Sequence, residues 1–188
     1  MAHRRSLMDK ASTVAPQRRR LYLAAGIGAF GAAIGLVKYL ADAGAAPAGN
    51  PIAIDIGDLP VDALRMVAWS GYTVWVLRRS VEQLAALADH EDELTDPRSE
   101  HSVQPAACRN RHRSLDPAIF VAIGQCTHQG CIPQLRFGPG AAREFLCPCH
   151  TSKYDLAGRV FRVGPAPANL VIPKYRFEGN ARLVIGED

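Results

Sequence analysis

The sequence predicts a mainly β protein, with an antiparallel β-sandwich head tethered to one N-terminal transmembrane helix. Three observations predict this fold class: a long uncharged stretch near the N-terminus, a short linker of small residues and proline, and many short apolar runs between turn residues. The 188 residues provide for one compact domain and an appendage. With 48% hydrophobic and 21% charged residues, the composition argues against extended disorder.

Residues 1–20 form a basic tail. The formal net charge of +4 arises here, from Arg4, Arg5, Lys10, Arg18, Arg19 and Arg20. The remainder of the chain is close to neutral, so we expect no nucleic-acid partner. Arg19 and Arg20, followed by Leu-Tyr-Leu, also resemble a twin-arginine (Tat) export signal with Tyr22 where Phe is usual. Such a signal suits a head that crosses the membrane already folded.

Residues 21–41 are predicted to be a transmembrane anchor. Residues 21–37 carry no charge, Lys38 can snorkel to the interface, and three more apolar residues follow. As a helix this segment is about 31 Å long, which matches the hydrocarbon core of a bilayer. The preceding arginines place the N-terminus in the cytoplasm and the head in the periplasm, as in a single-pass protein of the inner membrane. A buried helix of a soluble protein and a signal peptide cleaved near residues 43–45 remain alternatives.

Residues 42–51 are predicted to be a flexible linker, because they combine small residues with glycine and proline and offer little to pack. The head then occupies residues 52–188. Its expected strands are alternating or apolar runs bounded by turn residues. They are residues 52–56, 63–69, 72–77, 118–123, 170–172, 175–177 and 181–185. Ser70-Gly71 and residues 178–180 are expected hairpin turns, residues 81–88 a helix, and residues 89–113 polar coil.

Two loops carry the chemistry of the sequence. The first, residues 126–133, reads C-T-H-Q-G-C-I-P, and the second, residues 147–152, reads C-P-C-H-T-S. Each pairs a cysteine with a histidine, and a strand leads into each, so rigid strands can present four ligands to one point. Three interpretations compete: two disulfides with incidental histidines, a Cys2His2 zinc site, or a 2Fe-2S cluster with two cysteines on one iron and two histidines on the other. The zinc site leaves the second cysteine of each loop unexplained.

These residues resemble a known family. C-T-H-x-G-C followed by C-P-C-H-x-S is similar to the Rieske iron–sulfur subunit of the cytochrome bc complex, the ubiquinol–cytochrome c reductase. The resemblance continues through Tyr154, Asp155, Gly158 and the segment Gly164-Pro165-Ala166-Pro167. It reaches outward to the anchor, the linker and the hairpin of residues 69–79. The resemblance therefore implies a Rieske head with a small cluster-binding subdomain at about residues 122–167.

The resemblance also assigns roles to individual residues. It implies that Cys126 and Cys147 bind the inner iron of a Rieske 2Fe-2S cluster, and that His128 and His150 bind the outer iron. It implies a disulfide between Cys131 and Cys149 that ties the two loops together. By the same resemblance, Ser152 and Tyr154 donate hydrogen bonds to sulfur, and Gly164 and Pro165 belong to a proline loop that covers the cluster.

The implied function is that of an electron-transfer subunit in a respiratory chain. The subunit accepts an electron from ubiquinol, with a proton on His128 or His150, and passes the electron to a c-type cytochrome. Its partners would be cytochrome b and the c-type cytochrome in a dimeric membrane complex, which is an oxidoreductase and translocase. The chain is not expected to turn over alone. The alternatives are a Rieske carrier in another oxidoreductase, such as an arsenite oxidase-like enzyme, or a membrane-tethered zinc module.

Two positions depart from the family's pattern. Gln129 stands where leucine is usual, at the tip expected to dock on cytochrome b. Thr151 replaces the usual glycine, so a positive φ at this position would strain the threonine. Neither change touches an expected ligand. Cys108, in the polar stretch, has no partner in this scheme and is expected to be functionally silent.

Overall fold

The computed structural model describes residues 47–137 and 143–186. In these residues the chain is mainly β, and every strand pairing is antiparallel. The predicted tail, the anchor at 21–41 and the linker as far as residue 46 lie outside the described residues. Within the part that is described, no helix has the length and apolar character needed to cross a bilayer.

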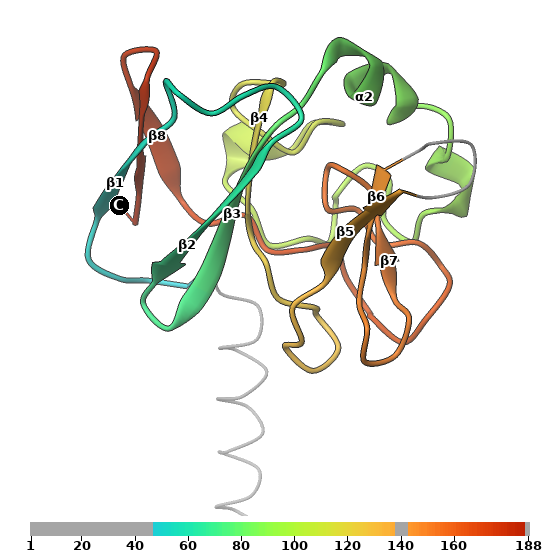
Figure 1. The fold of residues 1–188 in the computed structure, drawn as a ribbon. Coiled ribbons are helices and arrows are strands. Elements are labelled where there is room, and N and C mark those ends of the chain that lie inside the picture. The colour runs from blue at the N-terminus through green and yellow to red at the C-terminus, as the bar shows by residue number, and fades with distance from the viewer. Residues whose placement is uncertain (1–46, 138–142, 187–188) are drawn as a thin grey trace, which may run out of the picture. The chain divides into compact units, whose positions relative to one another are not determined.

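The strands of the described residues form three sheets of three strands each, in the orders β1–β9–β8, β2–β3–β4 and β5–β6–β7 (Figure 1). The first two sheets contain β1 (Ile52–Asp55), β9 (Arg182–Ile185), β8 (Tyr175–Glu178), β2 (Leu64–Trp69), β3 (Tyr72–Arg78) and β4 (Ile119–Ile123). The third contains β5 (Gln134–Phe137), β6 (Arg143–Leu146) and β7 (Lys153–Tyr154). The helical elements within residues 47–137 and 143–186 are α2 (Val81–Ala86) and the 3-10 turns η1 (Glu91–Glu93) and η2 (Ala106–Cys108).

The hairpin predicted around Ser70-Gly71 is confirmed. β2 and β3 pair in register up to Trp69 and Tyr72, which leaves Ser70 and Gly71 as a two-residue turn. Both turn residues have positive φ, 48° at Ser70 and 81° at Gly71. Positive φ at both central positions matches the twist of a hairpin and fixes the register of the two strands.

The predicted helix is also confirmed, although it ends two residues earlier than expected, at Ala86. A capping box begins it: the Ser80 side chain accepts from Gln83 N, and the Gln83 side chain accepts from Ser80 N. The chain then turns through η1 and η2 instead of running as uninterrupted polar coil.

The prediction of a strand at residues 170–172 was wrong. Leu170 and Ile172 are fully buried, but the backbone of this segment bonds to three separate parts of the chain. Leu170 N donates to Gly158 O, Val171 O accepts from Ile123 N, and Ile172 N donates to Val103 O. Burial gave the segment its apolar sequence, while the hydrogen bonds that would form a ladder are divided among unrelated neighbours.

The hydrophobic core centres on β3 and β4. Val74 to Leu77 and all of β4 are buried. From β3, the Trp75 ring stacks on Phe145 of β6 with ring centroids 4.4 Å apart. This contact packs the central sheet against the small sheet β5–β6–β7, from which the two cysteine–histidine loops extend (Figure 1).

Candidate metal centre

The first loop follows β4 and closes on itself through the backbone. Cys126 N donates to Cys131 O at 2.7 Å, and Gly130 N donates to Cys126 O at 2.8 Å. Gly130 has φ 76°, a conformation that glycine adopts without a steric cost. The closed loop buries Cys126, half-buries His128 and leaves Gln129 exposed at its tip.

The second loop joins β6 to β7 in a similar way. Cys147 N donates to Ser152 O at 2.8 Å, and Thr151 N donates to Cys147 O at 3.0 Å. Cys147 is buried and His150 is exposed. Thr151 has φ 60°, so the threonine occupies the left-handed conformation. This is the positive φ that was expected to strain a threonine in place of the family's glycine.

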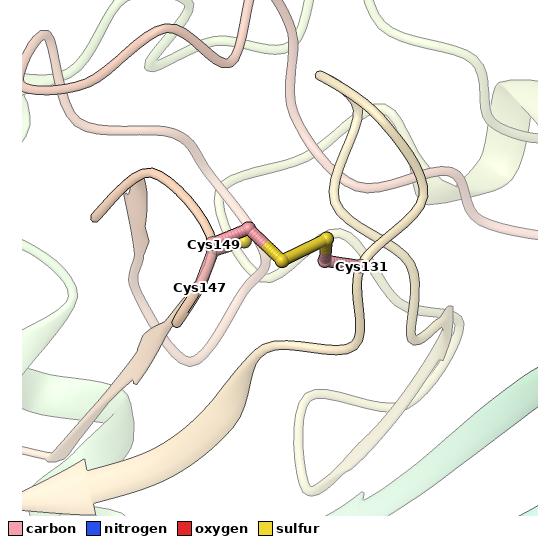
Figure 2. A group of neighbouring side chains, drawn as sticks. All are labelled: Cys131, Cys147 and Cys149. Atoms are coloured by element: carbon pink, nitrogen blue, oxygen red, sulfur yellow. A yellow bond between two sulfur atoms is a disulfide. The ribbon is translucent and has the colours of Figure 1, made fainter.

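A disulfide between Cys131 and Cys149 ties the two loops together (Figure 2). This is the pair that the resemblance implies, and its Cα atoms lie 6.6 Å apart. The Cys147 sulfur lies within 4.8 Å of both disulfide sulfurs. The covalent link therefore holds a buried thiol of one loop close to the other loop.

The two histidines face each other across the gap between the loops. Their Nδ1 atoms are 3.2 Å apart, and the rings meet edge to face. A metal ion binds a histidine nitrogen at about 2.0–2.1 Å, so two nitrogens at this separation fit the coordination shell of a single ion. The His128 and His150 imidazoles are thus close enough together to serve as ligands of one ion.

The two remaining cysteines of these loops, Cys126 and Cys147, form a buried thiol pair. Burial raises the pKa of the Cys147 thiol above its ordinary value, and the neighbouring Cys126 thiol raises it further. Such a pair becomes a pair of thiolates only beside a strong positive charge, which a bound metal ion supplies. Two cysteine thiols and two histidine imidazoles match the mixed donor set of a Rieske 2Fe-2S cluster, so the residues present fit that group.

The Tyr154 hydroxyl contacts one thiol of this pair, that of Cys126. It donates to Cys126 Sγ at 3.2 Å and accepts from Thr127 N at 3.1 Å. Burial raises the pKa of Tyr154, and the Cys126 contact raises it further. The hydroxyl therefore stays protonated and serves as a donor to sulfur.

The expected proline loop packs against Ser152. The buried Ser152 Oγ accepts from Ala166 N at 3.1 Å, so its own proton remains to be donated. Gly164 has φ 98°, and a Cβ atom on it would lie 2.7 Å from Ser152 Cα. Only glycine permits this close approach. Pro165 is exposed beside it.

Sequence reasoning missed one residue of the site. Thr127 Oγ1 donates to Ala168 O at 2.7 Å and lies 3.2 Å from the Tyr154 hydroxyl, so Thr127 joins the first loop to both the tyrosine and the end of the proline loop. Its position between two expected ligands was the available signal. Cys108 is a buried free cysteine beside Tyr175, and burial raises the pKa of its thiol.

Comparison with known proteins agrees with this geometry. Residues 52–176 match the family described as "Rieske [2Fe-2S] domain". The chain is 46% identical over 191 residues to the ubiquinol–cytochrome c reductase iron–sulfur subunit of Allochromatium vinosum, covering 95% of this chain and 92% of that protein. It is 36% identical to the subunit of the same name from Bradyrhizobium diazoefficiens, over 91% of this chain and 95% of that one. The corresponding values for the Blastochloris viridis subunit are 34%, 92% and 93%. The chain therefore belongs to the Rieske 2Fe-2S family, and within it to the iron–sulfur subunits of ubiquinol–cytochrome c reductase.

Proposed function

We propose that this chain is the electron-transfer subunit of a respiratory cytochrome bc complex, which accepts an electron from ubiquinol and passes it to a c-type cytochrome. The observation that carries the proposal is the convergence of two histidine Nδ1 atoms, 3.2 Å apart, from two loops that each also carry a buried free cysteine. The family relationship supports the same function.

The cofactor of this family is a Rieske 2Fe-2S cluster. Cys126 and Cys147 would hold one iron, and His128 and His150 the other. When bound, the cluster supplies reversible one-electron chemistry, at a higher potential than a cluster with four thiolate ligands. The disulfide keeps the two ligand-bearing loops together.

The histidines are also the proposed proton acceptors. With their Nδ1 atoms turned toward each other, the Nε2 atom of each ring remains to bind a proton. His150 is exposed and His128 half-buried, so a quinol hydroxyl can reach them from solvent or from a partner's pocket. A quinol that loses an electron also loses a proton, and an imidazole at hydrogen-bond distance can take it.

Tyr154 and Ser152 would adjust the ease of reduction. A hydroxyl that donates to sulfur stabilises added negative charge, so each such bond favours the reduced form. The Tyr154 donation to Cys126 Sγ supports this role, and Ser152 keeps its proton available while it accepts from Ala166 N.

For the remainder of the chain, we propose the organisation predicted above. A cytoplasmic tail with a Tat-like signal (1–20), an anchor (21–41) and a linker (42–51) would carry a periplasmic head (52–188), whose cluster-binding subdomain spans about 122–167. The alignment to the Allochromatium protein supports it, since it covers 95% of this chain. Sheets β1–β9–β8 and β2–β3–β4 would form the sandwich, since Leu183 and Val74 belong to one buried cluster. Cytochrome b and a c-type cytochrome, in a dimeric complex, would be the partners.

Turnover of the complex tests the proposal. Membranes carrying the full chain should reduce cytochrome c with ubiquinol, and membranes carrying the Cys147→Ser variant should lose this activity to the level of membranes that lack the chain. Cys108→Ser is a matched control, since Cys108 is also a buried free cysteine but lies beside Tyr175. Ubiquinol oxidation that persists in the Cys147→Ser membranes would contradict the proposal.

A further inference from the structure

Three arginine side chains are buried in the described part of the head: Arg79 is 2% exposed, and Arg113 and Arg159 are 0% exposed. A buried guanidinium needs a full set of acceptors, because desolvation of an unpaired charge is costly. Among the described residues, Asp155 is the only buried carboxylate. Burial lowers the pKa of both Arg79 and Arg113 to about 10, so both remain charged near neutral pH. Backbone carbonyls therefore supply most of the acceptors.

The three guanidiniums converge on residues 155–159, which we call the anchored turn. Their contacts are Arg79 Nη1 to Leu156 O (3.0 Å), Arg113 Nη1 to Ala157 O and Gly158 O (3.2 Å each), and Arg159 Nε to Asp155 Oδ2 (2.7 Å). The Asp155 carboxylate also accepts from Ala157 N and Arg159 N within the turn. Arg79 and Arg113, which lie outside the turn, thus bind the carbonyls of residues 156–158. Arg159 binds the Asp155 carboxylate across the turn.

The same guanidiniums reach into the irregular segment that follows α2. Arg79 donates to the His112 and Pro117 carbonyls, and Arg159 to those of Leu87 and Pro97. This segment is therefore the support on which the turn is fixed. Its polar composition gave no hint of this role.

The anchored turn is connected to the Tyr154 hydroxyl in two ways, through the backbone of Tyr154 itself and through the segment that binds Thr127. Tyr154 directly precedes it in the chain. At the other end, Leu170 N donates to Gly158 O, and Arg113 Nη2 donates to Leu170 O at 2.7 Å. Two residues before Leu170, Ala168 O accepts from Thr127 Oγ1, which lies 3.2 Å from the tyrosine hydroxyl.

We infer that Arg79 and Arg113 are positioning residues for Tyr154, acting through the anchored turn to hold its hydroxyl against Cys126 Sγ. The inference rests on the proposed function only in requiring a bound cluster whose potential this hydrogen bond raises. It differs from a direct effect of buried positive charge. A charge acts on the potential whether or not the tyrosine hydroxyl is present, while a positioning residue acts only through that hydroxyl.

Reductive titration of the purified full chain, followed by electron paramagnetic resonance, tests the inference. Arg113→Lys keeps the charge but loses the planar fork that reaches three carbonyls. It should lower the equilibrium constant for reduction severalfold in the Tyr154 background. In the Tyr154→Phe background, which itself loses about tenfold (about 59 mV for one electron), it should cause no further change.

Two outcomes would overturn the inference: an equal shift in both backgrounds, or no shift in either. Arg79→Lys and Gln104→Ala provide milder variants, since Leu156 O is one of several acceptors of Arg79 and Gln104 bonds only Arg113 Nε in this network. If these variants retain the cluster and show no Tyr154-dependent shift in the equilibrium constant for reduction, the inference is also overturned. Arg78→Lys is the matched control, since Arg78, the last residue of β3, directly precedes Arg79 but donates to Ile56 O. A missing signal in the wild-type chain would instead count against the proposed function.

Discussion

The Tyr154 hydroxyl lies 3.2 Å from Cys126 Sγ and is the donor of the pair. Tyr154→Phe removes this donor and leaves the ring in the core. We expect the midpoint potential of the cluster to fall by roughly 60 mV, which is a tenfold change for one electron. Reductive titration measures the shift. Tyr72→Phe, at the exposed end of the β2–β3 hairpin, is the control and should leave the potential unchanged. Equal potentials for both variants would contradict this role of the hydrogen bond.

Thr151 is held in a conformation that favours glycine. With φ at 60°, the threonine carries a cost of about 1–2 kcal/mol, part of which glycine would lose again to its greater freedom in the unfolded chain. Thr151→Gly should therefore raise the free energy of unfolding by about 0.5–1 kcal/mol. Thr73→Gly, within β3, is the matched control and should lower it. Chemical denaturation at equal cluster content compares the two, and a loss of stability in both would refute the strain.

Gly164 and Gly179 separate steric fit from backbone strain. Both have positive φ, but a Cβ on Gly164 would lie 2.7 Å from Ser152 Cα, while one on Gly179 would meet nothing within 4 Å. Gly164→Ala should displace the proline loop, reduce the cluster content and destabilise the head by about 2 kcal/mol more than Gly179→Ala does. Visible absorbance per protein and thermal unfolding measure the two effects. Equal losses in both variants would show that the approach to Ser152 does not matter.

The Cys131–Cys149 disulfide closes a loop with a sequence separation of 18 residues. Chain entropy alone assigns about 3 kcal/mol to such a link. A Cys131→Ser, Cys149→Ser double variant should lose stability of this order and release its cluster more readily. Adding a thiol reductant should reproduce the loss in the wild-type chain and have no further effect on the double variant. If the reductant destabilises both proteins alike, the loss is not due to this disulfide.

Local sequence patterns predicted those parts of the fold whose causes are local. The Ser70-Gly71 turn carries its own signal, since two residues with positive φ between apolar runs make a hairpin. The helix after Ser80 likewise begins at a capping box. The strands of the sheet β5–β6–β7 have only two to four residues each, which is too short for a visible period.

The candidate ligands of the site could be predicted from the sequence, but the residues that position them could not. Cysteine and histidine spacing identified four candidate ligands, of which the structure brings the His128 and His150 rings within 3.2 Å of each other and buries Cys126 and Cys147. The contacts of Thr127 and of the buried arginines depend on which distant carbonyl meets each side chain. Arg113, for example, bonds to Leu170, 57 residues away. The strand predicted at residues 170–172 was wrong for a related reason. An apolar run indicates that a segment is buried, but it does not indicate which groups its backbone bonds to.

Electron paramagnetic resonance of the purified chain, reduced first with ascorbate and then with dithionite, would detect a Rieske 2Fe-2S cluster and bracket its potential. We expect a Rieske signal after ascorbate alone, because two imidazole ligands and the Tyr154 donor favour a high-potential cluster. A signal only after dithionite would contradict quinol oxidation and indicate a lower-potential carrier. No signal under either reductant, with zinc in place of iron, would contradict the cluster itself.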